Sequence, residues 1–285
     1  MFAAWGAIAL TSCGWFSEPS ASEPEGDLPP IASSIGQSRR VDPEWAKVHR
    51  WGALRVGIDP AVGYDYLFSN SDAETYDGFE WQVLQAISAE IGVDVQAIPT
   101  PWSKQLAELD AGNVDVIWGA REAAGIDDSR FLTTVPYYDH PQAMLARSDR
   151  EPPVREFSDL FGLRVGIVTE STGAALMTTY NDRRGKAIRL FASRNLDRIV
   201  EQIRQDELDV VVVPRPIATS LARASQDSTV DQSMALIVVG APVMETPLVG
   251  VVQAERASIK DVLDDAIAEL KGEGKLDRIL EQWQL

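Results

Sequence analysis

From Leu54 onward the sequence alternates short apolar runs with segments whose apolar residues follow a helical period. In residues 78–92, for example, Leu84, Ile87 and Ile91 fall on one helical face, and a glycine ends the segment. The first part of this alternation predicts strands at residues 54–58, 93–98 and 114–117, and helices at 78–92 and 102–110. Such a β-α-β-α-β order places the strands parallel in one sheet, because each helix carries the chain back across it.

The alternation begins again at Leu163 and continues to the end of the chain. It predicts strands at 163–168, 188–191, 208–213 and 236–239. Five helices are expected: one that begins at Ala174, one over 194–204 with Ser193 as its cap, one that ends at about Ala224, one over 259–270 and one over 275–283. Two lobes of similar size, joined by two extended crossings, are the economical arrangement. The predicted fold class is therefore α/β, with a mainly parallel sheet flanked by helices in each lobe.

The first crossing is predicted within Asp115–Arg147, where a buried strand opens into a charged loop. Pro136-Tyr137-Tyr138 then forces an extended path, and these tyrosines and His140 are expected to serve a hinge. Pro247–Val252 offers the second crossing. Ligands of open α/β sheets bind outside the carboxyl ends of strands, so residues 118–122 are expected to face a cleft.

The composition argues against several functions. The formal charge is −17, and no basic stripe exists that could displace counterions from phosphates, so no nucleic-acid partner is expected. One cysteine and two widely separated histidines offer no metal-ligand spacing and no disulfide within the chain. We therefore expect neither a metal nor a cofactor.

Residues 1–13 have the pattern of a lipoprotein signal segment. Met1–Leu10 is an apolar run too short to span a bilayer as a helix. Leu10-Thr11-Ser12-Cys13 resembles the bacterial lipobox, which implies that Cys13 is diacylated and anchors the chain to a membrane. No lysine or arginine precedes the apolar run, and the alternative is a buried or frayed cysteine in a short terminal helix.

Residues 14–44 are rich in Ser, Glu, Pro and Gly and poor in apolar side chains. Such a composition cannot bury enough apolar surface to fold. The segment is therefore expected to be a disordered tether between the anchor and a folded body that begins near Trp45–Trp51.

Several short motifs in the folded body occur together in one order. They are Leu54-Arg55-Val56-Gly57-Ile58-Asp59-Pro60, Gly78-Phe79-Glu80, Pro101-Trp102, Gly112-Asn113-Val114-Asp115, Pro136-Tyr137-Tyr138, Ser171-Thr172-Gly173, Arg215-Pro216 and Trp283. With these motifs the chain resembles family 3 of the bacterial solute-binding proteins, which feed polar amino acids to ABC importers. The resemblance implies a periplasmic-binding-protein clamshell that closes on its ligand, outside the cytoplasm. It also implies a first lobe of residues 45–139 and 246–285 and an inserted second lobe of 140–245.

The binding loop departs from the pattern of that family. Counted without gaps from Asp115 to Pro136, the place of the arginine that forks onto a ligand carboxylate holds Asp127. The place of the aspartate that receives the ammonium group, just before Arg215, holds Pro214. If the loop is helical, Arg130 lies on the same face as Asp127 and could take over the role of the missing arginine.

The candidate ligand-binding residues fall into four chemical groups. Aromatic faces suited to stacking or to a cation come from Tyr64, Tyr66, Trp102 and Trp118. Carboxylates for a cationic group come from Glu80 and Glu122, and guanidinium groups for an anion come from Arg121, Arg130 and Arg215. Hydroxyls at a helix N-terminus come from Ser171 and Thr172. Ordinary packing, solvated charge and helix capping are the alternatives for these residues.

The sequence thus predicts a membrane-tethered binding protein without catalytic activity. It is expected to capture a small polar, amino-acid-like solute, in a pose other than the usual zwitterion clamp, and to deliver it to the permease and ATPase of an importer. A degenerate binding protein that acts as a sensor, or as an accessory to a periplasmic enzyme system, is one alternative. A dehydratase related to those of prephenate-type acids, with Glu80 or Glu122 as general acid, is another.

Overall fold

The computed structural model describes residues 43–70, 75–226 and 235–285. The predicted lipidation of Cys13 and nearly all of the predicted tether lie outside these residues. The described chain begins with helix α1 (Pro43–Trp51), in which Trp45 and Val48 are buried. Among the described residues, no helix combines the length and the apolar character needed to cross a bilayer.

The first sheet follows the predicted alternation of strands and helices. Its strands are, in spatial order, β4 (Asp94–Pro99), β1 (Ala53–Ile58), β5 (Val116–Ile117), β12 (Val251–Gln253) and β6 (Phe131–Thr133). As predicted, β1 runs parallel to β4 and β5, whereas β12 is antiparallel to β5 and β6. The connecting elements are η2 (Pro60–Val62), the hairpin of β2 (Phe68–Asn70) and β3 (Thr75–Asp77), and helices α2 (Phe79–Ile91) and α3 (Gln105–Asp110).

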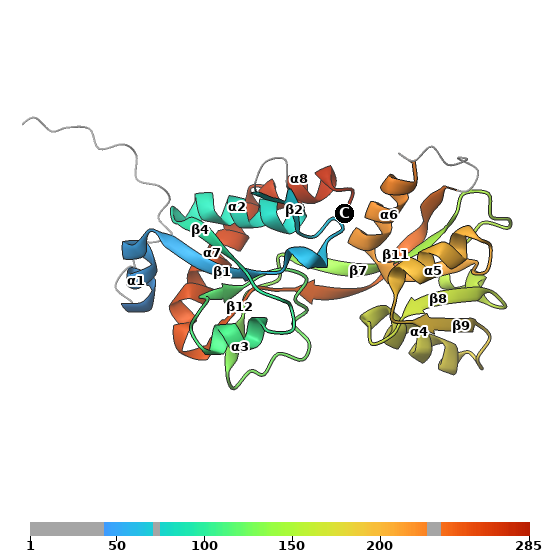
Figure 1. Cartoon of the computed structure of the whole chain (residues 1–285), viewed down its shortest axis with the longest axis horizontal. Coiled ribbons are helices and arrows are strands. Elements are labelled where there is room, and N and C mark those ends of the chain that lie inside the picture. The colour runs from blue at the N-terminus through green and yellow to red at the C-terminus, as the bar shows by residue number, and fades with distance from the viewer. Residues whose placement is uncertain (1–42, 71–74, 227–234) are drawn as a thin grey trace, which may run out of the picture. The chain divides into compact units, whose positions relative to one another are not determined.

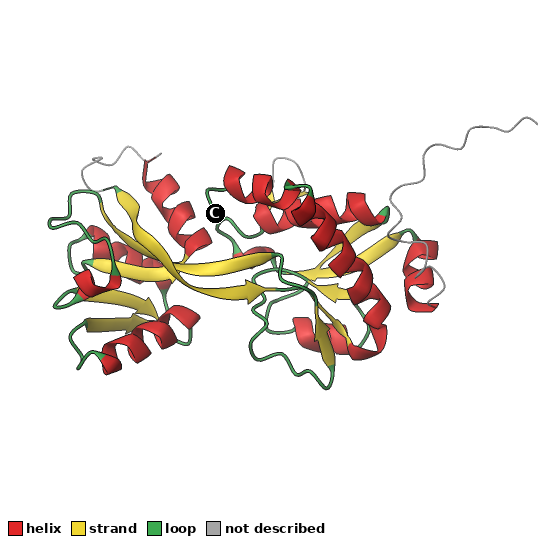
Figure 2. Cartoon of the chain, turned by 180° about the vertical axis from the view of Figure 1, so that it is seen from behind, coloured by secondary structure: helices red, strands yellow, loops and turns green. Residues whose placement is uncertain are grey.

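The second sheet is also mixed, so the prediction that each sheet is mainly parallel is wrong: the strands that cross between the sheets, and those beside them, pair antiparallel. Its strands are, in spatial order, β11 (Leu236–Leu248), β7 (Tyr138–Arg147), β10 (Val210–Pro214), β8 (Arg164–Val168) and β9 (Arg189–Ser193). β8 runs parallel to β9 and β10, and β7 runs antiparallel to β10 and β11. The accompanying helices are η3 (Phe157–Leu160), α4 (Thr172–Arg183), α5 (Leu196–Arg204) and α6 (Arg215–Gln226). Figure 2 shows helices beside both sheets, and the predicted α/β class with two sheet-and-helix lobes is confirmed.

Two paired strands, β7 and β11, carry the chain between the two sheets (Figure 1). The sequence predicted a strand that ends at Val239, and this prediction is wrong, because β11 continues to Leu248 through a bulge. Gly240 has a φ of 69°, and a Cβ at this position would lie 2.5 Å from the carbonyl oxygen of Arg155. The glycine therefore marks an irregularity within one long strand. The predicted boundaries between the two lobes fall within these two strands. The division of the chain into those lobes remains a prediction.

One predicted helix start is also wrong. Asn195, not Ser193, caps α5, because its side chain accepts a hydrogen bond of 3.0 Å from the backbone N–H of Arg198. The Ser193 hydroxyl instead accepts a hydrogen bond from the backbone N–H of Asn195, at 3.1 Å. Serine and asparagine are both favourable N-cap residues, so the sequence alone does not distinguish them. Which of the two caps the helix depends on where the preceding strand ends.

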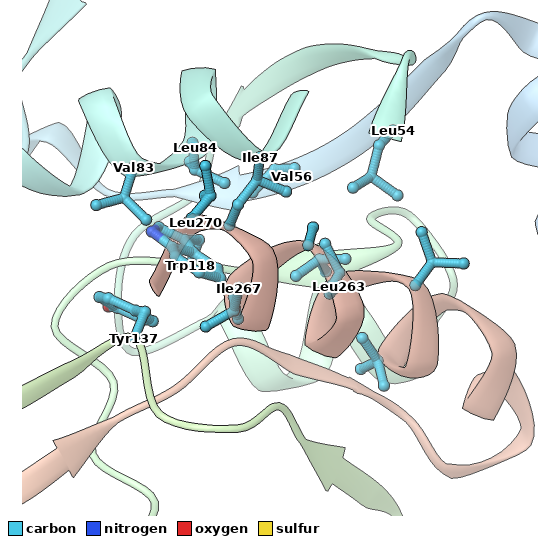
Figure 3. Close-up of a cluster of buried hydrophobic side chains, with 14 of the residues drawn as sticks. Leu54, Val56, Val83, Leu84, Ile87, Trp118, Tyr137, Leu263, Ile267 and Leu270 are labelled. Carbon is cyan, nitrogen blue, oxygen red and sulfur yellow. The ribbon is translucent and has the colours of Figure 1, made fainter. Parts of the chain in front are cut away.

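The largest core lies between the first sheet and helices α2, α7 (Ala257–Gly272) and α8 (Lys275–Gln282). A short turn, η5 (Ala254–Arg256), leads from β12 into α7. In Figure 3, Ile267 and Leu270 of α7 lie close to Trp118 and Tyr137 in this cluster. The rings of Trp118 and Tyr137 are stacked, with centroids 4.1 Å apart, and both are fully buried.

Both sheets contain the same ion-pair arrangement. Arg55 of β1 donates to both carboxylate oxygens of Asp115, from Nε at 3.0 Å and from Nη2 at 2.6 Å, and its backbone N–H donates to the same carboxylate. Arg164 of β8 donates to Asp209 in the same three ways, at 2.7 to 3.1 Å. The matching segments 54–58 and 163–167, both Leu-Arg-Val-Gly-Ile, therefore form equivalent strands of the two sheets.

Candidate functional site

The loops that follow β1, β4 and β5 emerge at one edge of the first sheet, because the three strands are parallel neighbours. Ligands of open α/β sheets bind at such an edge. The loops are linked there, since the backbone N–H of Trp102 donates to Asp59 Oδ2 at 2.6 Å. The loop after β5 carries Arg121 and Glu122 and pairs with the end of β11, through the bridge between Glu122 and Leu248.

Glu122 connects this edge to the second sheet. The hydroxyl of Thr172, the first residue of α4, lies 2.9 and 2.8 Å from the two carboxylate oxygens of Glu122. Thr246 Oγ1 donates to Oε1 of the same carboxylate at 3.2 Å, and His140 Nδ1 lies 3.5 Å from it. His140, Thr172 and Thr246 together outweigh burial and hold the pKa of Glu122 below its ordinary value. The structure thus brings Glu122 and Thr172 together, with the carboxylate ionised at neutral pH.

Behind Glu122 lies a buried pair of rings. The hydroxyl of Tyr66 is hydrogen-bonded to His140 Nε2, and the two rings meet edge to face with centroids 5.6 Å apart. Burial, together with the nearby Glu80 carboxylate, raises the pKa of Tyr66 well above its ordinary value. Tyr66 therefore supports the imidazole that faces Glu122, and its ring is not open to solvent.

A second connection between the sheets was not foreseen from the sequence. The buried carboxylate of Asp65 accepts hydrogen bonds from Thr219 at 3.0 Å and from Arg223 at 2.9 Å, both on α6. Arg215, at the start of α6, donates to the carbonyl oxygen of Gln284 at 3.1 Å. No motif in the sequence pairs residue 65 with residues more than 150 positions later. Tyr64 lines a surface pocket of about 420 Å³ beside this connection, together with Phe68, Ser220, Ala224 and Trp283.

Arg121 points away from Glu122 and toward α3. Its guanidinium stacks on the ring of Trp102, with its Cζ 3.7 Å from the ring centroid. Nη2 donates to the carbonyl oxygen of Trp102 at 3.0 Å and to Gln105 Oε1 at 2.8 Å. The Arg121 side chain is buried, whereas Trp102 keeps 46% of its surface exposed.

Glu80 is fully buried and positions the loop rather than facing a ligand. Its Oε1 accepts hydrogen bonds from the backbone N–H of Ala120 at 2.7 Å and from the hydroxyl of Tyr137 at 2.5 Å. Ala120 adopts a φ of 50°, which is unfavourable for a residue with a Cβ, so this hydrogen bond helps to hold the turn that presents Arg121 and Glu122. Burial raises the pKa of Glu80 to about 7.

The raised pKa of Glu80 predicts a pH dependence of stability. An unfolded glutamate titrates near pH ~4.3, so between that pH and about 7 the folded protein holds a proton that the unfolded chain releases. Stability should therefore fall as pH rises through this window. We expect Glu80→Gln to remove this part of the slope when melting temperatures of the variant and the wild type are compared from pH 4.5 to 8. Parallel curves for the two proteins would contradict the assignment.

The remaining candidates lie in different surroundings. Trp118 is in the core. Ser171 caps α4, accepting from the backbone N–H of Ala174 at 3.1 Å. Arg130 lies 2.5 Å from Asp110 Oδ2 in an exposed ion pair, and residues 128–130 form a turn. The helix assumed for this loop is therefore absent.

Comparison with known proteins agrees with this architecture. The sequence profile of bacterial extracellular solute-binding proteins, family 3, matches residues 54–285. The L-cystine-binding protein TcyJ of Escherichia coli (strain K12) is 23% identical over 240 residues, which cover 83% of this chain and 84% of that protein.

Two solved structures illustrate the same fold. The probable amino-acid ABC transporter extracellular-binding protein ytmK from Bacillus subtilis matches with a TM-score of 0.71 at 17% identity, over 81% of this chain and 97% of that one. An ancestral cationic amino acid solute-binding protein matches with a TM-score of 0.68 at 20% identity, over 84% and 99%. These likenesses show the fold, and the profile covers nearly the whole described body. The chain therefore belongs to family 3 of the bacterial extracellular solute-binding proteins.

Proposed function

We propose that this protein is a lipid-anchored receptor that captures a small amino-acid-like solute between its two lobes and delivers it to the permease and ATPase of an ABC importer. The contact between Glu122 and Thr172 carries this proposal, because it joins the carboxyl edge of the first sheet to the first turn of α4. Family membership supports substrate binding outside the cytoplasm, and the relatives above are named as binding proteins rather than enzymes. Cys13 would supply the anchor and residues 14–44 the tether.

The ionised Glu122 favours a solute that carries a cation. Its carboxylate lies at the junction of the lobes. A positively charged donor of the solute can take the place of the Thr172 hydroxyl as its hydrogen-bond partner. The usual zwitterion clamp is not favoured, because Asp127 is exposed in a turn and Pro214 has no carboxylate. The half-exposed rings of Tyr64 and Trp102 would flank such a solute at the rim.

A thermal-shift screen of amino acids, amines, opines, sugars and dicarboxylates tests the receptor function, since a ligand that binds only the folded state raises its melting temperature. For a cationic solute found in this way, we expect Glu122→Gln to weaken binding by about 10- to 100-fold in calorimetry. Asp127→Asn is the matched control, because the hydrogen bonds of this exposed carboxylate within the described residues are to Ser129 of its own turn. Equal affinities for the wild type and Glu122→Gln would remove Glu122 from the site.

One observation favours the alternative of a sensor or accessory protein. The Glu122 carboxylate is satisfied by side chains of the protein itself, those of Thr172, Thr246 and His140, which suits lobes that are held together by their own polar contacts. If no compound in the screen raises the melting temperature, this alternative replaces the receptor. The dehydratase alternative gains nothing from Glu80, because a fully buried carboxyl cannot reach a substrate.

A further inference from the structure

The carboxylate of Asp65 is buried where the two lobes meet. It follows β1 and η2 of the first lobe, yet its side chain is only 3% exposed. Its partners are the hydroxyl of Thr219, at 3.0 Å, and the guanidinium of Arg223, whose Nη1 and Nη2 lie 2.9 and 3.3 Å away. Both partners are on α6 of the second lobe, one helical turn apart and therefore on one face. A helix of one lobe thus seals a charge of the other.

Asp65 is fixed to the first lobe through the backbone of its loop. Its carbonyl oxygen accepts a hydrogen bond from the backbone N–H of Phe79, at the start of α2, at 2.9 Å, and that of Tyr66 accepts from Glu80 at 3.0 Å. Gly78 has a φ of 114°, and a Cβ there would lie 2.3 Å from the Tyr66 carbonyl oxygen. The loop therefore packs against the start of α2 more closely than a residue with a side chain would permit.

The α6 helix is fixed to the second lobe through neighbouring positions. Ala218 and Ala222 are buried in a core that they share with β7, β10 and the start of β11. Thr219 and Arg223 follow these alanines by one residue each, so they point about 100° further around the helix, toward the first lobe. The contact between α6 and the first lobe therefore joins two bodies that are each held by their own core.

This contact is reinforced at its edge and remains open to water. Arg215, at the start of α6, donates to the carbonyl oxygen of Gln284 at 3.1 Å, and Figure 1 shows α6 beside the C-terminus. The side chain of Arg223 is 37% exposed and lines two surface pockets, of about 420 and 380 Å³. When a carboxylate and a guanidinium separate at such a surface, water hydrates both groups, so the bond can break and form again without leaving a buried charge unpaired.

We propose that Asp65, Thr219 and Arg223 form a latch that closes the lobes without touching the solute. The latch opens when the crossing strands β7 and β11 bend and the two bodies part, and it forms again when they meet. It raises the fraction of the protein that is closed before the solute arrives, and the apparent affinity for the solute rises with that fraction. Only this effect on affinity rests on the proposed receptor function, because closure itself can be measured without a solute.

X-ray scattering of the solute-free full chain tests the latch. Asp65→Asn keeps the size of the side chain but removes its charge, and Arg223→Gln removes the charge of its partner. We expect both variants to shift to a larger radius of gyration than the wild type. The double variant should shift no further, because all three lack the same ion pair. These proteins share residues 1–42, so a difference in radius reports on the lobes.

Asp149→Asn is the matched control for this experiment. Asp149 accepts hydrogen bonds from Nε and Nη2 of Arg147, at 2.9 and 2.5 Å, so it too is an aspartate held by an arginine fork. Both residues belong to the second lobe, and the loss of their pair should leave the radius unchanged. Equal radii for the wild type, Asp65→Asn and Arg223→Gln would overturn the latch. A lower melting temperature with an unchanged radius would overturn it as well, because Asp65 would then only stabilise the fold.

The solute then tests the effect on affinity. A compound found in the thermal-shift screen should return Asp65→Asn to the radius of the wild type, and we expect it to bind this variant about 10-fold more weakly in calorimetry. Unchanged affinity together with a larger radius would contradict the proposal, because the latch would then close the lobes without influencing capture. If no compound binds, the receptor function is wrong, whereas the scattering experiment still decides whether the latch exists.

Discussion

Trp118→Ala is expected to lower the free energy of unfolding by about 4 kcal/mol, because it opens a large cavity in the main core. The indole is fully buried and stacks on Tyr137. Gly250 packs against it so closely that a Cβ there would lie 2.9 Å from the Trp118 ring. The surrounding chain therefore has little freedom to collapse into the space. Urea denaturation followed by circular dichroism gives the value.

The control for this prediction is Trp51→Ala. Trp51 is 62% exposed, so its loss should change stability by less than about 0.5 kcal/mol. The pair also decides the function of Trp118, which the sequence placed among the ligand-binding residues. Near-wild-type stability of Trp118→Ala, with loss of solute binding, would return the indole to the cleft.

Asp115→Asn is expected to cost about 3 kcal/mol, because it leaves the guanidinium groups of Arg55 and Arg256 without their shared carboxylate. Burial opposes ionisation of this group, but hydrogen bonds from both arginines hold the pKa of Asp115 below its ordinary value. Its contribution is therefore complete above the pKa of an unfolded aspartate, near pH ~3.9, and is lost as pH falls through the lower folded value.

The equivalent pair of the second sheet provides the matched control. In this pair Arg164 is the main partner of Asp209. The Asp209 side chain is 17% exposed, whereas that of Asp115 is 0% exposed. Better solvation should reduce the cost of Asp209→Asn to about 1 kcal/mol. Equal melting temperatures of the two variants at pH 7 would show that burial does not set the strength of this shared arrangement.

The sequence predicted the fold well because its signals are local. Alternating apolar strands and helices that end in glycine fixed β1, α2, β4 and β5, and the parallel pairing followed from their order. The full extent of β11 was missed, because a glycine that follows an apolar run, such as Gly240, is typical of a strand end. Only the pairing with β7 shows that the strand continues past Gly240 through a bulge.

The site was harder to predict because its residues meet through tertiary contacts. The sequence placed Glu122 in a loop expected to face a cleft, and the structure shows that its partner there is Thr172. The roles of Asp65, His140 and Thr246 could not be seen, because their partners lie 74 to 158 residues away in the chain. The same limit applies to Arg121, whose stacking on Trp102 and hydrogen bond to Gln105 are visible only in three dimensions.

Hydrogen–deuterium exchange with and without the stabilising solute tests the central claim most directly, namely that the solute is enclosed where Glu122 meets Thr172. Peptides covering residues 118–122 and 169–174 come from the loop after β5 and from the start of α4. We predict that a saturating solute slows exchange in both peptides together. Protection of one peptide alone, or of neither while the melting temperature rises, would contradict a binding site shared by the two lobes.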